Sequence, residues 1–95
     1  MLAETSARTV LVHDQHGLHL RPCSSIVNVV KRHRAQVTVQ KGGQAVNAAS
    51  ILGLLSLAAA QGAELIVSAT GPDAEAALEA VARLFAREPE LANCA

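Results

Sequence analysis

The hexapeptide Gly17–Pro22, Gly-Leu-His-Leu-Arg-Pro, holds the side chains of this chain that are best placed to do chemistry. The glycine at its start and the proline at its end predict a loop that enters a helix, because proline suits the first helical turn, where its missing N–H costs little. The first N–H groups of a helix lack intrahelical partners and, with the macrodipole, form an anion site. A phosphoryl group on the ring of His19 would face these donors, and Arg21 could add its guanidinium to the phosphate oxygens.

The same helix end bears on the protonation of His19. The positive pole of a helix disfavours an imidazolium, so we expect a neutral and nucleophilic imidazole near neutral pH. For a single histidine before a helix, however, a capping or surface role is the commoner one. The residue types alone therefore leave both interpretations open.

A metal site is a further hypothesis, because His13, His16 and His19 recur at every third position and Cys23 lies nearby. Histidine and cysteine are the ligands that zinc uses. We expect His13 to belong to a strand and His16 to a turn, so equal spacing does not bring the rings to one point. The sequence therefore predicts no metal site, and His33 is interpreted as a solvated residue at a helix end.

The elements that must position these residues follow from the apolar pattern, which predicts the order βαββαβα. Strands are expected over residues 9–13, 36–40, 45–48 and 65–69, with a hairpin turn at Gly42–Gly43. Helices are expected from about Leu20, after an N-cap at Ser50, and from Ala74 until Pro89 stops the last one. Four strands and three helices in this order predict an α+β fold, an open-faced two-layer sandwich with an antiparallel sheet and the helices on one face.

Composition excludes several classes of function. The length of 95 residues predicts a single domain, residues 1–95. Eight basic and eight acidic side chains balance, and Phe85 is the sole aromatic residue, so neither the positive charge nor the stacking platform of a nucleic-acid binder is expected.

The apolar segments and the cysteines of the sequence indicate the compartment of the protein and its relation to membranes. The apolar stretch Ile51–Ala60 is much shorter than the roughly 20 residues that a membrane-spanning helix requires. Residues 1–8 lack the apolar segment of a signal peptide. Cys23 and Cys94 are too few for a disulfide scaffold and are interpreted as reduced thiols. We therefore expect a cytoplasmic protein with no membrane insertion.

The hexapeptide resembles the phosphohistidine signature of the histidine-containing phosphocarrier (HPr) family, whose usual form is Gly-Ile/Leu/Met-His-x-Arg-Pro. The resemblance continues through residues 46–57, where the family carries its second signature, and through residues 62–64 and 68–73. It covers about residues 9–88, which leaves short extensions at both ends of the chain. Two separated motifs within the family's order of elements are far more specific than the hexapeptide alone.

The resemblance implies a phosphocarrier rather than a stand-alone enzyme. His19 would accept a phosphoryl group from phosphoenolpyruvate through enzyme I and donate it to enzyme IIA proteins of a sugar phosphotransferase system. Arg21 would be the phosphate partner, with Gly17 and Leu20 forming the loop and backbone of the site. Neither a metal nor a cofactor is implied, because catalysis rests on positioning and charge stabilisation. A monomer is expected.

The resemblance also implies a regulatory and docking surface. Ser50 aligns with the family's regulatory serine, the target of an HPr kinase/phosphorylase, although it could instead be only an N-cap. The residues implied in partner docking lie on two helices and are Leu20, Cys23, Ser24, Ile51, Leu52 and Leu55. Some of these could be ordinary core, but Leu52 at least should be exposed.

Departures from the family pattern bear on which partners bind. Leu20 stands where alanine or threonine is more usual, Cys23 replaces a typical alanine, and Ala49 replaces the lysine often found before the serine. Two alternatives therefore stay open. A nitrogen-type regulatory carrier is similar over residues 69–73 and the last helix, whereas residues 50–53 are closer to the sugar branch. A binding-only module is the other, and the presence of His19 argues against it.

Overall fold

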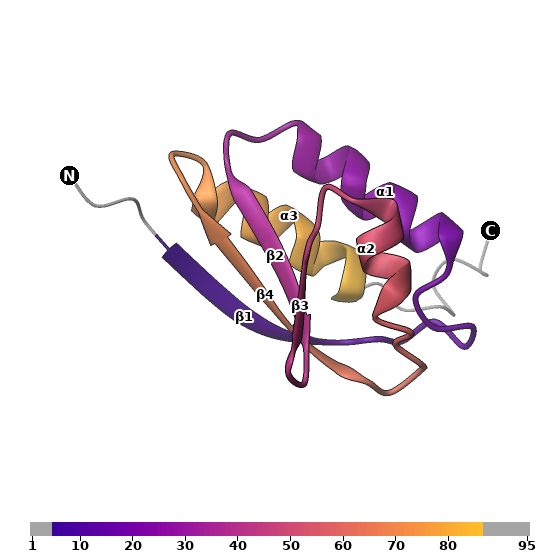
Figure 1. Cartoon of the computed structure of the whole chain (residues 1–95). Coiled ribbons are helices and arrows are strands. Elements are labelled where there is room, and N and C mark those ends of the chain that lie inside the picture. Colours follow the sequence, from indigo (N-terminus) through magenta and orange to yellow (C-terminus); the bar gives the residue numbers. More distant parts are fainter. Residues whose placement is uncertain (1–4, 87–95) are drawn as a thin grey trace.

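The computed structural model describes residues 5–86 of the chain (Figure 1). Along the chain the elements follow the predicted order βαββαβα. Their bounds are β1 Thr5–Leu11, α1 Leu20–Lys31, β2 Gln36–Lys41, β3 Gln44–Asn47, α2 Ile51–Ser56, β4 Glu64–Thr70 and α3 Ala74–Ala86.

The four strands form one antiparallel sheet in the order β1-β4-β2-β3. Alternation along β4 sends Leu65, Val67 and Ala69 into the core and leaves Ile66 exposed on the open face. Helices α1 and α3 lie along the same face of the sheet, and α2 packs beside the first half of α1 (Figure 1). The predicted α+β open-faced sandwich is thus confirmed.

The core is aliphatic and fills the space between the sheet and the helices. On α1 the buried residues recur at i, i+3, i+4 and i+7, as the sequence predicted: Cys23, Ile26, Val27 and Val30. Burial of each aliphatic side chain contributes about 1.5–3 kcal/mol. The apolar stripe of α3, from Ala74 to Phe85, covers the sheet beside it. None of the helices in this part of the chain has the length and apolar character that crossing a bilayer requires.

Two details of the sequence interpretation are corrected. Strand β1 ends at Leu11, so His13 belongs to the following loop and not to a strand. The strand instead starts earlier, because its polar first half pairs with β4 from Thr5↔Thr70 onward. His33 is half-buried, with Nδ1 2.9 Å from the Val29 carbonyl oxygen, and is therefore not simply a solvated residue. Pro89 and Cys94 lie outside the described residues.

Two loops meet at the end of the sheet where α1 begins. The loop 12–19 is hydrogen-bonded to the loop 57–63 through Val12 N–H to Ala63 O at 3.0 Å, Gly62 N–H to Val12 O at 2.8 Å and Leu18 N–H to Ala59 O at 2.9 Å. The segment that leads into α1 is therefore held by main-chain bonds to a distant part of the sequence. This attachment determines where the ring of His19 can lie.

Candidate functional site

His19 is the N-cap residue of α1, with an extended backbone (φ −110°, ψ −170°). Its carbonyl oxygen accepts from Cys23 N–H at 3.1 Å, but its side chain makes no capping hydrogen bond. The ring is 39% exposed. A side chain that stands at a helix start without capping it is free to react with a group arriving from solvent.

The start of α1 offers two backbone donors. The N–H groups of Leu20 and Arg21 come before any intrahelical acceptor, and Pro22 has no N–H. Their dipoles, together with the macrodipole, favour an anion at this end of the helix.

Gly17 is required by the shape of the loop that leads to His19. Its φ is +73°, and a Cβ at this position would clash with the carbonyl oxygen of Ala59 and lie 3.1 Å from Ala60 Cα. Gly17 N–H donates to Asp14 O at 2.9 Å, which closes a tight turn. Only glycine combines this conformation with so close an approach of two backbones.

Asp14 is a site residue that the sequence interpretation missed. Its Oδ2 lies 3.3 Å from Nε2 of His19, and its Oδ1 accepts from His16 N–H at 2.8 Å. The hydrogen bond from His16 N–H holds the pKa of the Asp14 carboxyl below its ordinary value, and the side-chain hydrogen bond with His19 acts in the same direction. The available signal was an aspartate ahead of the turn glycine, since aspartate side chains accept from the N–H two residues on.

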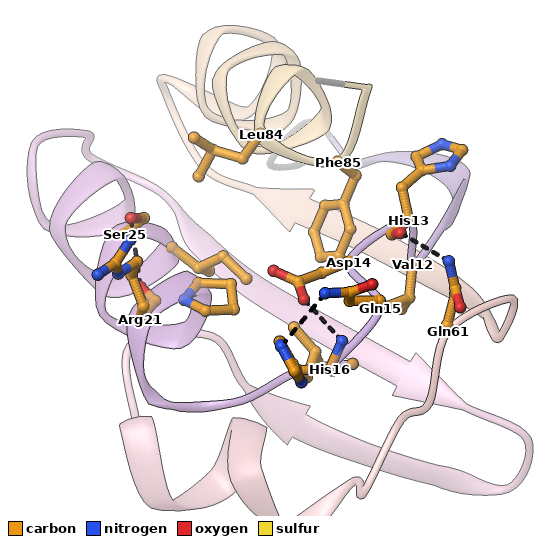
Figure 2. A pocket seen from close by; sticks show the side chains of 14 residues that line it. Val12, His13, Asp14, Gln15, His16, Arg21, Ser25, Gln61, Leu84 and Phe85 are labelled. Carbon is orange, nitrogen blue, oxygen red and sulfur yellow. Dashed lines mark hydrogen bonds between the residues drawn. The ribbon is translucent and has the colours of Figure 1, made fainter. Parts of the chain in front are cut away.

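The other histidines do not converge with His19. The ring of His16 stands edge-on to that of His19, with centroids 5.8 Å apart. Figure 2 shows the ring of His13 turned away from Asp14, on the side of Gln61, whose Nε2 donates to His13 O at 3.2 Å. Within residues 5–86 there is no group of three potential metal-ligating side chains.

Arg21 is exposed on the first turn of α1 and lines an open cleft of about 710 Å³. Figure 2 shows Arg21 and Ser25 together on α1, across this cleft from His13 and Gln61. In the described part of the chain, no hydrogen bond or ion pair joins the Arg21 side chain to His19. The structure therefore places the two on the same helix start but does not bring their side chains together.

Ser50 is the N-cap of α2, and its Oγ accepts from Gly53 N–H at 3.0 Å. The predicted N-cap is confirmed. Leu52 is 79% exposed, which confirms that expectation, whereas Ile51 and Leu55 are half-buried against the core. Of the apolar residues implied in docking, Leu52 and Leu20, which is 60% exposed, are thus the ones that present their side chains to solvent.

Cys23 is wrongly included in the docking set. Its side chain is fully buried, because it begins the apolar stripe of α1 that packs on the core, and it therefore offers no surface to a partner. Burial raises the pKa of the Cys23 thiol, which disfavours the reactive thiolate. Ser24, next to it, is half-buried and stays available at the edge of the surface.

Comparisons with known proteins agree with the geometry. Residues 6–87 match the family model described as "PTS HPr component phosphorylation site". A phosphocarrier protein HPr of Treponema pallidum (strain Nichols) is 40% identical over 78 residues, which are 82% of this chain and 89% of that protein. A multiphosphoryl transfer protein of Haemophilus influenzae is 33% identical over 81 residues, 82% of this chain but 16% of that protein. The crystal structure of a phosphocarrier protein HPr from Bacillus anthracis superposes with a TM-score of 0.81 at 37% identity, covering 85% of this chain and 96% of that one.

Proposed function

The chain belongs to the HPr family of the phosphotransferase system, and from this premise we propose that it carries a phosphoryl group on His19, taken from phospho-enzyme I and passed to enzyme IIA proteins. The observation that carries the proposal is the ring of His19 at the N-cap of α1, which makes no capping hydrogen bond, is 39% exposed and lies beside backbone donors without intrahelical partners. A multiphosphoryl transfer protein among the relatives supports a role in a chain of phosphoryl transfers.

The transfer step uses groups of this chain alone. A lone pair on the His19 imidazole forms an N–P bond as the P–N bond of the donor phosphohistidine breaks, and that bonding pair returns to the donor ring. The N–H groups of Leu20 and Arg21 and the macrodipole of α1 stabilise the charge on the phosphoryl oxygens. Rotation of the exposed Arg21 side chain adds a guanidinium to the same oxygens. We propose neither a metal nor a cofactor, and the carrier acts as a cytoplasmic monomer.

Partner docking is proposed on the surface around Leu20 and Leu52, flanked by Ser24, Ile51 and Leu55. The two leucines are exposed apolar side chains on neighbouring helices. A contiguous exposed apolar patch is typical of protein interaction sites, and the contact of α1 with α2 places these leucines on adjoining elements. This surface adjoins the start of α1, so a partner bound there would reach the ring of His19.

Phosphorylation of Ser50 by an HPr kinase/phosphorylase would regulate docking. A phosphate at this N-cap would add charge beside Leu52 while remaining compatible with the N-terminus of α2. The variant Ser50→Asp should therefore bind enzyme I more weakly than the wild type, and titration calorimetry measures the difference. The variant Ser50→Asn is the matched control without charge, and equal affinity of all three proteins would exclude regulation through charge.

Incubation with phosphoenolpyruvate and a bacterial enzyme I, followed by intact-mass measurement, tests the proposed function. We expect one acid-labile phosphate on the wild type and on His16→Ala, and none on His19→Ala. His16→Ala is the matched control because its ring lies 5.8 Å from that of His19. A phosphate retained in His19→Ala would contradict the assignment, as would an unlabelled wild type when the same enzyme I labels another carrier.

The pathway is a separate question that the same assay addresses. Phosphotransfer from a sugar-type and from a nitrogen-type enzyme I can be compared, and residues 69–73 are similar to the nitrogen branch. We propose the sugar branch because Ser50–Gly53 is closer to it. Faster labelling by a nitrogen-type enzyme I would assign the chain to the regulatory branch instead.

A further inference from the structure

The turn before α1 directs a carboxylate at the ring of His19. The Asp14 carbonyl accepts from Gly17 N–H, which reverses the chain, and Asp14 Oδ1 accepts from His16 N–H at 2.8 Å, which fixes the side chain. The second oxygen, Oδ2, is then left facing Nε2 of His19 at 3.3 Å. Two oxygens of one carboxylate thus have different partners, one within the turn and one on the ring.

Within residues 5–86, Asp14 makes the one side-chain hydrogen bond to His19. The nearby ring of His16 stands edge-on, and its own Nε2 lies 3.5 Å from Gln15 Nε2. Within the described residues, the loop that contains Ala59 accepts a hydrogen bond from Leu18 N–H and makes no hydrogen bond to the His19 ring. The orientation of the His19 ring therefore depends on Asp14.

We propose that Asp14 is a positioning residue for His19, holding the ring proton on Nε2 and so presenting the lone pair of Nδ1 to the incoming phosphoryl group. A carboxylate only accepts hydrogen bonds, so the nitrogen that faces it must carry the hydrogen. A neutral imidazole has one N–H, and the other nitrogen is then the nucleophile. The proposal rests on the carrier function of His19 and adds to it the residue that orients the ring and selects its tautomer.

The transfer step shows what this selection does. The Nδ1 lone pair forms the N–P bond, the P–N bond of the donor phosphohistidine breaks, and the Nε2–H stays on His19, bonded to Asp14. A phosphoryl group on Nε2 would instead lie against the Asp14 carboxylate, where like charges repel. Asp14 therefore both presents one nitrogen and shields the other.

Two variants separate this role from support of the turn. In Asp14→Asn the amide oxygen still accepts from His16 N–H, so the turn is kept, but the NH₂ group now faces Nε2 and donates to it. The favoured tautomer then changes to Nδ1–H, and the nucleophilic lone pair moves to Nε2. In Asp14→Ala both bonds are lost and neither tautomer is selected.

The experiment measures ¹⁵N shifts of the His19 imidazole in the unphosphorylated protein and then labels it with phosphoramidate, a small donor that needs no partner protein. We expect Nε2–H and labelling at Nδ1 in the wild type and in His16→Ala. We expect mainly Nδ1–H in Asp14→Asn, with labelling of Nδ1 slowed about tenfold, because inverting one hydrogen bond to a charged group is worth about a factor of ten. Asp14→Ala should fall between the two.

The proposal would be overturned if Asp14→Ala were impaired more than Asp14→Asn in labelling of Nδ1. If Asp14 only supported the turn, Asp14→Asn would behave as the wild type and Asp14→Ala would be the impaired variant. Wild-type tautomer and labelling in both variants would overturn it too. The tautomer measurement needs no phosphoryl transfer, so a carrier that enzyme I fails to label would contradict the proposed function while leaving the role of Asp14 to be decided by the spectra.

Discussion

The two helix starts that carry residues capable of phosphorylation differ in how their N-cap side chains are used. Ser50 caps α2 by accepting from Gly53 N–H at 3.0 Å, whereas the side chain of His19 makes no capping bond on α1. Both residues have extended φ values, −113° and −110°. The hydroxyl of Ser50 is thus used in capping, whereas the ring of His19 caps nothing and bonds through Nε2 to Asp14, which leaves Nδ1 available for chemistry.

The glycines near the two helix starts also differ in their structural roles. Gly53 lies inside α2, where a Cβ would meet Ser50 Oγ and Val46 Cβ at 3.3 Å, so it lets α2 pack closely on β3. Gly17 lies before α1 and has a positive φ, and it lets the loop pass the backbone of Ala59. One glycine serves packing of a helix, and the other serves the approach of a loop that presents a reactive side chain.

The largest effect on stability is expected at Gly17. Gly17→Ala combines a left-handed backbone with a clash against Ala59, so we expect a loss of about 3 kcal/mol or more in the free energy of unfolding. Gly42→Ala is the matched control, since its φ is +58° and nothing lies within 4 Å of the added Cβ, and we expect a loss of about 1–2 kcal/mol. Urea denaturation measures both, and equal losses would show that the contact with Ala59 is unimportant.

Arg21 tests whether the start of α1 needs more than backbone donors. Arg21→Ala should slow phosphorylation of His19 by about tenfold to a hundredfold, because a charge-assisted hydrogen bond is worth roughly 1.5–3 kcal/mol. Arg21→Lys keeps the charge but loses the bidentate geometry, and it should retain part of the rate. Single-turnover transfer from phospho-enzyme I gives these rates. An unchanged rate in Arg21→Ala would mean that the backbone donors suffice.

Variants of Ser50 test whether the N-cap of α2 contributes to stability rather than to phosphorylation of His19. Ser50→Ala should lower the free energy of unfolding by about 1 kcal/mol through loss of the cap, with phosphorylation of His19 changed less than twofold. Ser50→Asp restores an acceptor for Gly53 N–H and should be close to the wild type in stability. Thermal denaturation is the measurement. Full stability of Ser50→Ala would remove the structural account of this serine and leave regulation as its main role.

The smallest effect on stability is expected at Leu52. Leu52→Ser should change the free energy of unfolding by less than about 0.5 kcal/mol, because the side chain is 79% exposed, yet it should weaken binding of enzyme I. Ile66→Ser, exposed on the open face of the sheet, is the matched control and should leave binding unchanged. Equal weakening by both variants would mean that docking is not confined to the surface around Leu20 and Leu52.

Local sequence patterns predicted most of the fold. The apolar stripe of α1, the cap at Ser50 and the exposure of Leu52 were predicted and are confirmed, because each depends on residues a few positions apart. The extent of β1 was not, since its polar residues from Thr5 onward join the sheet by pairing with β4, more than 50 residues away. Tertiary pairing extended this strand beyond its own apolar signal.

The site was predicted less completely than the fold. The glycine before His19 and the helix start are signals along the chain, but the contact of Asp14 with the ring depends on the exact course of the turn. Cys23 was placed in the docking set by the resemblance, although the apolar stripe of α1 already favoured burial. At this position the apolar spacing of the helix predicts burial correctly, whereas closeness to the site in sequence does not predict exposure.

The central claim is that His19, the N-cap residue whose side chain makes no capping hydrogen bond, is the reactive one. It is tested most directly by labelling the protein with phosphoenolpyruvate and enzyme I and mapping the phosphate by electron-transfer fragmentation. The account predicts phosphate on His19 and none on Ser50, His13, His16 or His33. Phosphate on another of these residues, with His19 unmodified, would contradict it.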